Sequence, residues 1–242
     1  MSRRSKKKRN NKFLSIVFCI LLAYFIYYVQ EEYIKLNKNE EVEYYDFENI
    51  PEYNGEAYIY INNNEPFFNE EDITVDNFEY YSNLDELGRC GVVYANISKY
   101  SMPTEDRESI GNIQPSGWQT IKYDIVSGKY LYNRCHLIGY QLTGENDNEN
   151  NLITCTRYMN ATTMLKFENE VASYVDETGN HVLYRVTPYF KDDNLVATGV
   201  MVEAYSVEDN GEGLKFNVFI YNVQPGIIID YKTGDSKEEK SD

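Results

Sequence analysis

Three long strand-like runs in the C-terminal half constrain the fold of this chain more than any other feature. They are HVLYRVTPYF at 181–190, LVATGVMVEAYSV at 195–207 and KFNVFIYNV at 215–223. β-Branched and aromatic side chains, which pack well on a pleated sheet, dominate all three. The linkers between them are short and rich in Asp, Asn and Gly, which favours antiparallel pairing of neighbouring runs. The sequence therefore predicts an antiparallel meander.

Shorter strand candidates and one helix precede the meander. The strand candidates are residues 57–61, 91–97 and 129–132. Residues 161–179 place apolar side chains at helical spacing, and Gly179 is suited to end that helix. A polar block at 133–160 lies just before it. These elements predict an α+β fold with a mainly antiparallel sheet.

The N-terminus combines a basic segment with an uncharged apolar one. Residues 1–12 hold seven Lys and Arg and no acid, and residues 13–29 (FLSIVFCILLAYFIYYV) carry no charge. The apolar segment is just long enough to span a bilayer, and the charge distribution predicts a cytoplasmic N-terminus with the remainder outside. A cleaved signal peptide is the main alternative, but no A-x-A-like site follows Val29. We expect an uncleaved anchor rather than a signal peptide or a buried globular helix.

These features divide the chain into five regions. After the basic segment and the anchor, residues 30–56 are rich in Glu, Asn and Tyr and predict an extracellular linker. Residues 57–231 form the expected catalytic domain, and the short charged segment 232–242 is expected to be a disordered tail.

The chain beyond residue 12 is strongly acidic. It retains 16 of the 23 Lys and Arg residues against 39 Asp and Glu residues, a net charge of about −23. A protein that coats nucleic acid needs a basic surface, so this charge excludes a passive coat protein. It remains compatible with a catalytic site that contacts a polyanion through a metal and a few local cations.

Cysteine usage argues against a structural zinc site. Cys19 lies in the apolar segment, whereas Cys90, Cys135 and Cys155 follow it, and no CxxC pair occurs. Three cysteines permit at most one disulfide, and their spacing does not identify the pair.

Histidine chemistry has two candidates, His136 and His181. His181 opens a predicted strand after a turn, where a histidine is usually structural. His136 lies in the polar block, together with a set of polar residues that suits acid–base and metal chemistry. This set comprises Asn133, Arg134, Asn151, Arg157, Asn160 and, on the predicted helix, Glu168. A neutral imidazole can take a proton from water, and a hydrated Mg²⁺ ion needs only one or two protein oxygens.

The polar block resembles the DNA/RNA non-specific endonucleases of the ββα-metal fold, and among them the streptococcal surface and competence nucleases. The family signature, Asp-Arg-Gly-His followed by a metal-binding asparagine, corresponds to residues 133–136 and Asn160. The L-x-G-Y run after the histidine corresponds to residues 137–140, and the Asn-x(8)-Asn segment begins at Asn151. The resemblance covers roughly residues 85–225.

The resemblance implies a ββα-metal core and a role for each matching residue. His136 would be the general base and Asn160 the direct ligand of one Mg²⁺ ion, with Mn²⁺ as an alternative. Asn151 and Glu168 would support the hydrated metal, and Arg134 would contact phosphate. Two departures are Asn133 in place of Asp and Cys135 in place of Gly. A Cys135–Cys155 disulfide is conceivable because both residues flank the expected site.

Other side chains are candidates for substrate contact. Trp118 could stack on a base or belong to the core, and Lys122 could meet a phosphate or be a solvated surface cation. Arg157 could bind phosphate or pair with an acid, and Arg107 is a further cation upstream. The sequence thus predicts an extracellular, membrane-anchored endonuclease with DNA and RNA as substrates. The alternatives are a catalytically inactive binding module and a delivered toxin with an immunity partner.

Overall fold

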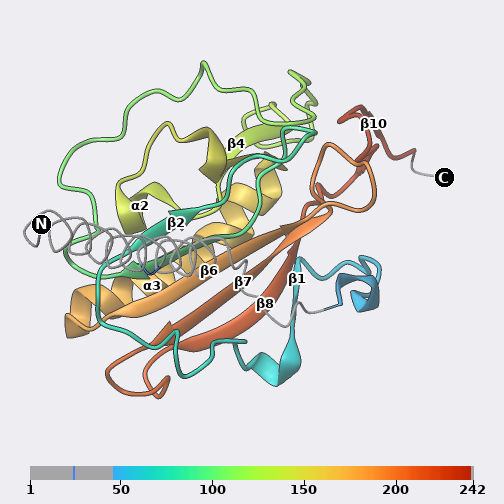
Figure 1. Ribbon diagram of the computed structural model, residues 1–242. Coiled ribbons are helices and arrows are strands. Elements are labelled where there is room, and N and C mark those ends of the chain that lie inside the picture. Colours follow the sequence, from blue (N-terminus) through green and yellow to red (C-terminus); the bar gives the residue numbers. More distant parts are fainter. Residues whose placement is uncertain (1–23, 25–45, 241–242) are drawn as a thin grey trace, which may run out of the picture. The chain divides into compact units, whose positions relative to one another are not determined.

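The computed structural model describes residue 24 and residues 46–240 (Figure 1). The predictions for residues 1–12 and 13–29, and for most of the linker at 30–56, lie outside the described residues. Within the described part of the chain, no helix combines the length and apolar character needed to cross a membrane. Residues 49–242 form one structural unit, and the elements below belong to it except for the start of the short helix at residues 47–49.

The centre of this unit is a six-stranded antiparallel sheet with strand order β1-β8-β7-β6-β3-β2. Its strands are β1 (Tyr58–Tyr60), β2 (Glu79–Tyr81), β3 (Val93–Ile97), β6 (Val182–Tyr189), β7 (Gly199–Ser206) and β8 (Lys215–Tyr221). Consecutive strands β6, β7 and β8 are neighbours, so the predicted meander is confirmed. All of β7 except Tyr205 is buried, which explains its nearly continuous apolar run.

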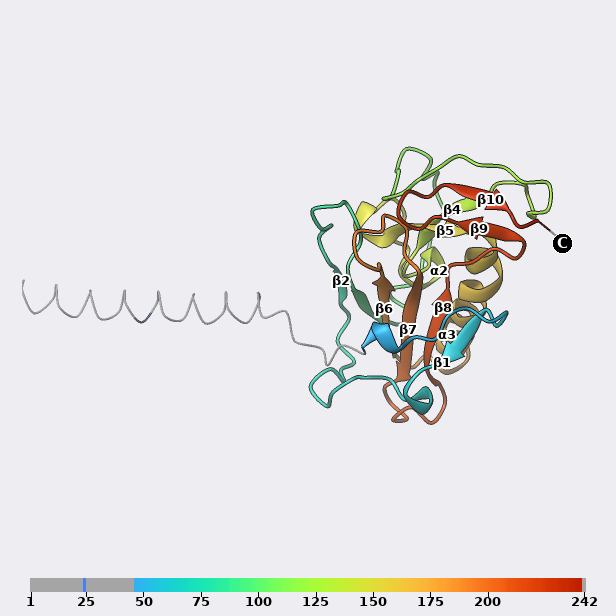
Figure 2. The same cartoon turned by 90° about the vertical axis from the view of Figure 1, so that its right-hand side faces the viewer.

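Helix α3 (Leu165–Thr178) packs along one face of the sheet (Figures 1 and 2). Phe167, Val171 and Val175 recur every four residues and are almost completely buried, in one core with the inward side chains of the sheet. Gly179 ends the helix with a φ of 73°, a left-handed conformation that glycine adopts without a Cβ clash. The predicted helix start is wrong, because residues Met159–Met164 form a π-helix before α3 begins.

A separate two-stranded antiparallel sheet lies within the polar block. It pairs β4 (Tyr132–His136) with β5 (Leu152–Thr156), and α2 (Tyr140–Thr143) and η3 (Glu149–Asn151) lie between them. Together with α3, this hairpin forms the predicted ββα unit. Every residue of β5 is buried, including two threonines, so the strand shows no alternation that sequence could reveal.

Buried polar side chains cover the opposite face of the large sheet. Asn217, Glu203 and Arg185 follow one another across β8, β7 and β6, and all three are buried. The Nη2 atom of Arg185 donates to the Phe67 carbonyl at 3.0 Å, and Glu203 Oε1 accepts from the Phe67 backbone N–H at 2.7 Å. Asn217 Nδ2 donates to the Glu65 carbonyl at 2.9 Å. These contacts hold the chain before β2 against the sheet.

Two boundaries differ from the sequence predictions. The expected disordered tail contains β10 (Ser236–Glu238), which pairs with β9 (Ile227–Ile229). Order also begins before residue 57. The short helix η1 (Phe47–Asn49) precedes Pro51, whose carbonyl accepts a hydrogen bond from the Tyr221 hydroxyl at 2.7 Å. The tail gains order by pairing with a nearby strand and the segment at Pro51 by contacting a residue distant in sequence, and composition reveals neither contact.

Candidate active site

His136 is the last residue of β4, and its ring is held between two different groups. Nε2 lies 2.7 Å from the Asn146 carbonyl oxygen, and Nδ1 lies 3.3 Å from Nη2 of Arg107. A carbonyl only accepts and a guanidinium only donates. These partners therefore assign the proton to Nε2 and leave the lone pair of Nδ1 as the acceptor.

The same surroundings keep His136 neutral. The residue is 6% exposed, and this burial lowers the pKa of His136 to about 4, with a smaller contribution from the positive charge of Arg107. The Asn146 carbonyl acts in the opposite direction and raises the pKa. At pH 7 the ring is therefore an uncharged proton acceptor.

The carboxylate of Glu168 lies beside the turn that follows His136. A Cβ atom added at Gly139 would lie 2.9 Å or less from all three atoms of that carboxylate group. A side chain at 139 would therefore displace the Glu168 carboxylate from its observed position. Gln141 Nε2 lies 3.4 Å from Glu168 Oε2. Burial raises the pKa of Glu168 to about 7, while Gln141 and then Arg107 lower it.

Asn151 fixes the backbone that follows His136. Its side chain is fully buried, with Oδ1 accepting from the Ile138 N–H at 2.9 Å and Nδ2 donating to the Ile138 carbonyl at 3.0 Å. Both ends of the amide are therefore committed to one residue of the turn. Asn151 therefore fixes the turn, and its support of a hydrated metal stays a prediction.

Asn160 lies in the π-helix between β5 and α3. The π-helix is anchored at its start, where Thr156 Oγ1 accepts from the Met159 N–H at 3.0 Å. Such helices are rare and occur often at functional sites. The side chain of Asn160 is partly exposed, and no residue in the described ranges forms a hydrogen bond with its amide. Its Oδ1 atom is thus available to a ligand.

Arg134 and Trp118 contact each other, which was not expected. The guanidinium of Arg134 lies 4.0 Å from the centre of the Trp118 ring. Its Nη2 donates to the Gly111 carbonyl at 2.8 Å, and its Nε donates to the Ile113 carbonyl. Trp118 packs against the small apolar cluster that includes Leu131. The two side chains therefore hold the loop that follows Arg107.

The two remaining predicted substrate contacts differ from each other. Lys122 is exposed, and its Nζ lies 4.4 Å from the centre of the Tyr130 ring, as expected for a surface cation. The backbone N–H of Arg157 donates to the Leu131 carbonyl at 2.7 Å. Among residues 46–240 no acid forms an ion pair with Arg157, so its charge is available to an anion.

The ring of His136 has two contacts that the sequence did not predict. Arg107 lies 29 residues before His136, and Asn146 contributes only its backbone carbonyl to the ring. Gly139 belongs to the L-x-G-Y run of the family resemblance, but the sequence gives no physical reason for a glycine there. The structure gives one, because the Glu168 carboxylate lies where a side chain would be. Neither Arg107 nor Asn146 has a local signal, because the contacts depend on how irregular loops fold over the hairpin.

Cys135 and Cys155 form a disulfide across the hairpin, with their Cα atoms 5.8 Å apart. Cys135 lies in regular β-structure and does not have a positive φ. The strain that a side chain would meet at a left-handed glycine position therefore does not arise, and the departure from the family glycine is accommodated. Cys90 is the free cysteine of the described chain, and burial raises its pKa to about 12.

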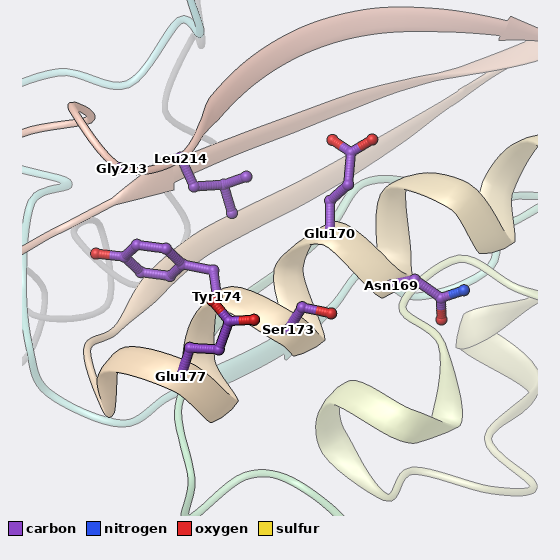
Figure 3. Close-up of a pocket in the computed structure, with 7 residues that line it drawn as sticks. All are labelled: Asn169, Glu170, Ser173, Tyr174, Glu177, Gly213 and Leu214. Carbon is purple, nitrogen blue, oxygen red and sulfur yellow. The ribbon is translucent and has the colours of Figure 1, made fainter.

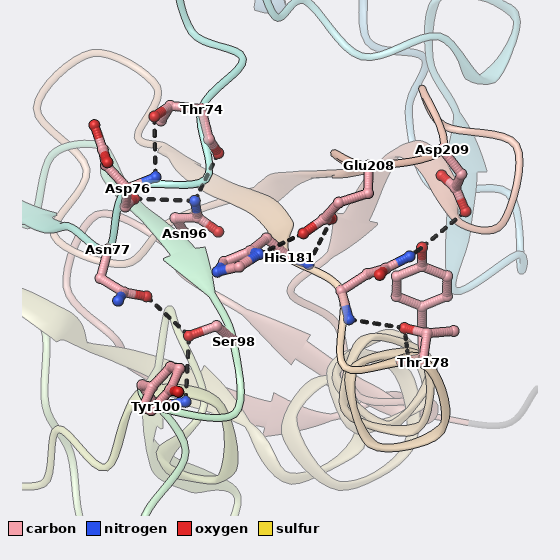
Figure 4. A network of polar contacts seen from close by, with 12 residues as sticks. Thr74, Asp76, Asn77, Asn96, Ser98, Tyr100, Thr178, His181, Glu208 and Asp209 are labelled. Carbon is pink, nitrogen blue, oxygen red and sulfur yellow. Dashed lines mark hydrogen bonds and ion pairs between the residues drawn. The ribbon is translucent and has the colours of Figure 1, made fainter.

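Two other features lie apart from this site. His181 pairs with Glu208, with Nδ1 2.6 Å from Oε1 and the backbone N–H donating to Oε2 at 2.8 Å (Figure 4). This contact supports the structural role expected for His181. A cavity of about 400 Å³ lies beside α3 (Figure 3), and none of the predicted site residues lines it. Its lining comprises Asn169, Glu170, Ser173, Tyr174, Glu177, Gly213 and Leu214.

Similar proteins have the same fold. Residues 69–208, more than half of the chain, match the family model described as DNA/RNA non-specific endonuclease. NucA from Streptococcus agalactiae, solved with a magnesium ion bound, is 25% identical with a TM-score of 0.67, over 76% of this chain and 89% of that one. Sda1 nuclease, solved with a bound zinc ion, is 27% identical with a TM-score of 0.56, over 68% and 81% of the two chains. The chain therefore belongs to the DNA/RNA non-specific endonuclease family.

Proposed function

We propose that this chain is an extracellular, membrane-anchored endonuclease that hydrolyses DNA and RNA, with His136 as general base and a divalent cation at Asn160. The observation that carries the proposal is the state of His136. Its ring is buried and neutral, Nε2 is fixed by the Asn146 carbonyl, and Nδ1 retains its lone pair. A general base must be unprotonated at the working pH and must lie within hydrogen-bond reach of the proton that it takes.

In the proposed reaction, Nδ1 of His136 takes a proton from the attacking water. The Asn146 carbonyl then stabilises the resulting imidazolium, because it accepts from Nε2–H. Arg107 is exposed and lies beside Nδ1, so it can also pair with the substrate phosphate. Pairing of Arg107 with phosphate would remove the smaller of the two causes that lower the pKa of His136, while burial, the larger cause, would remain. Arg157 supplies a second cation without an acidic partner among the described residues.

The donor atoms suit a hard, hydrated cation. Asn160 offers an amide oxygen and Glu168 a carboxylate, whereas the described residues contain no group of three or more His, Cys, Asp or Glu side chains placed to hold a metal. Mg²⁺ retains most of its water and accepts such a sparse site, and Mn²⁺ has similar preferences. A bound cation would neutralise charge on the phosphate and the leaving oxygen. The magnesium in NucA supports this choice, and the zinc in Sda1 makes the metal a question for experiment.

The extracellular location has two independent supports. The basic segment 1–12 followed by the apolar segment 13–29 has the pattern of an anchor with its N-terminus in the cytoplasm. The Cys135–Cys155 disulfide is typical of proteins that function in an oxidising compartment.

Incubation of the full-length chain with plasmid and with RNA tests the proposed activity. Cleavage of both is expected with Mg²⁺ or Mn²⁺, and none with EDTA. Intact plasmid and RNA under every metal condition, together with retained binding, would favour the inactive binding module.

Metal affinity is expected to depend on the proton of Glu168. Its raised pKa of about 7 means that the folded protein retains this proton well above the ordinary carboxyl range. Ionisation therefore costs stability as the pH rises through 7, and a bound cation offsets that cost. Mg²⁺ affinity should rise by about tenfold per pH unit below pH 7 and level off above it. Titration calorimetry at several pH values measures this.

Glu168→Gln serves as the matched variant for this measurement. It should bind Mg²⁺ more weakly and without the pH dependence, because glutamine has no proton to lose. A wild-type affinity that is constant from about pH 5 to pH 7 would contradict the assignment.

Trp118→Ala is expected to impair catalysis by loosening the loop that carries Arg107. The rate should fall by about tenfold on plasmid and on a small phosphodiester such as bis(p-nitrophenyl) phosphate. Trp118→Phe, which retains an aromatic face for Arg134, should restore most of the rate. If Trp118 instead stacks on a base, only KM for nucleic acid would rise and the small ester would be cleaved normally.

A further inference from the structure

The Cys135–Cys155 disulfide joins the two strands that carry the candidate catalytic residues. Cys135 directly precedes His136 on β4, and Cys155 on β5 lies five residues before Asn160. The covalent path from His136 to Asn160 therefore crosses the disulfide and avoids the long connection between the strands. Apart from that backbone connection, no other covalent link in the described chain joins the two strands.

The direction in which the His136 side chain points depends on the register of the small sheet. It has only two strands of five residues each, and it is separate from the six-stranded sheet. Two strands of this length would be marginally stable alone, and here the packing of Cys135, Ile153 and Cys155 in the main core also supports them. A slip of one residue would turn every side chain of β4 to the opposite face, including that of His136. In the observed register His136 pairs with Leu152, and Cys135 pairs with Ile153.

We propose that the Cys135–Cys155 disulfide is a positioning element of the active site. It fixes β4 against β5 and so holds His136 at a constant distance from the π-helix that contains Asn160. This inference rests on the proposed function. The rate of catalysis, and not only the stability of the fold, then depends on the bond, because catalytic groups lose efficiency steeply when displaced by about 1 Å.

Reduction of the bond has a defined chemistry. A dithiol reagent transfers two electrons and two protons, so Cys135 and Cys155 become thiols while the two thiols of the reagent form a disulfide. Both cysteines are completely buried, so the reagent reaches the bond only when the hairpin opens. Substitution is therefore the cleaner test, and reduction is a second one.

Cys90 provides a matched control. Its buried Sγ donates to the carbonyl of Leu152 at 3.2 Å, so it contacts the same hairpin without forming a disulfide. Cys90→Ser keeps a donor at this position. It should leave both the disulfide and the rate unchanged.

The decisive experiment compares the full-length Cys135→Ala/Cys155→Ala variant with wild type, well below the melting temperature of each and in saturating Mg²⁺. We expect kcat on plasmid and on bis(p-nitrophenyl) phosphate to fall by about tenfold or more, with KM changed by less than about threefold. Prolonged treatment with dithiothreitol should lower the wild-type rate similarly and leave the double variant unaffected. An unchanged kcat with a lower melting temperature would show that the bond only stabilises the fold.

Two further readouts separate this inference from the proposed function. Mass spectrometry of alkylated native protein should find one free thiol among Cys90, Cys135 and Cys155; three free thiols would overturn the inference. The NMR signals of the His136 ring should shift or broaden in the double variant and not in Cys90→Ser. If wild type cleaves nothing, the proposed function fails, and an unchanged His136 spectrum in the double variant would then overturn the positioning role as well.

Discussion

Replacing His136 with alanine is expected to lower the rate of DNA and RNA cleavage by about 10²- to 10⁴-fold while the protein stays folded. The substitution removes the Nδ1 lone pair, and the other histidine of the chain, His181, contacts Glu208 instead of this site. It also removes the hydrogen bond to the Asn146 carbonyl. The fold should persist, because the core of the hairpin is formed by residues such as Leu137 and Ile153.

Single-turnover cleavage of plasmid, with circular dichroism and Mg²⁺ titration on the same preparation, measures this effect. Metal binding should be close to that of wild type, since His136 holds no metal in the proposed site. His181→Ala is the matched control and should cleave at the wild-type rate if it is folded. If the His136 variant lost Mg²⁺ binding together with activity, His136 would be a metal ligand and not the general base.

The second large effect is expected from Asn160→Ala, which should lower the cleavage rate by about 10²-fold or more because a direct ligand is lost. Its Oδ1 has no partner among the described residues, so the substitution breaks no internal hydrogen bond. The loss should therefore appear in the metal affinity and hardly in the melting temperature. Raising the Mg²⁺ concentration should recover part of the rate.

Two variants control for the Asn160 prediction. Asn160→Asp retains an oxygen ligand and should keep measurable metal binding. Thr162→Ala alters an exposed residue of the same π-helix and should have no effect. Unchanged Mg²⁺ affinity in Asn160→Ala would place the metal elsewhere.

The fold was predictable where one local pattern dominated. The β6–β8 meander and the end of α3 at Gly179 follow from strand composition and turn chemistry. The local pattern did not predict β4 and β5 as strands, because Asn133 and Arg134 make β4 look polar and all of β5 is buried, so the strand pair was expected only from the family resemblance. Its pairing is decided by packing against α3 and the large sheet. Short-range patterns do not report such contacts.

The sequence predicted which residues belong to the candidate site, but it did not predict most of the contacts that they make. His136 was found because histidine is scarce in this chain, and Asn160 and Glu168 were found from the family resemblance. The expected role of Arg134 was phosphate contact, but its guanidinium holds loop carbonyls and Trp118. Asn151 has the expected position but is bonded to the backbone of the turn. Spacing identifies which residues share a motif, and only the fold shows which partner each one contacts.

In the proposed mechanism, His136 supplies the proton acceptor at a site that is otherwise complete. The most direct measurement is single-turnover plasmid cleavage by folded His136→Ala in saturating Mg²⁺, with and without added imidazole. Very slow cleavage is expected without imidazole, with a rate that rises with the concentration of neutral imidazole. The same addition should not accelerate wild type. Cleavage by His136→Ala at the wild-type rate before any imidazole is added would contradict this mechanism.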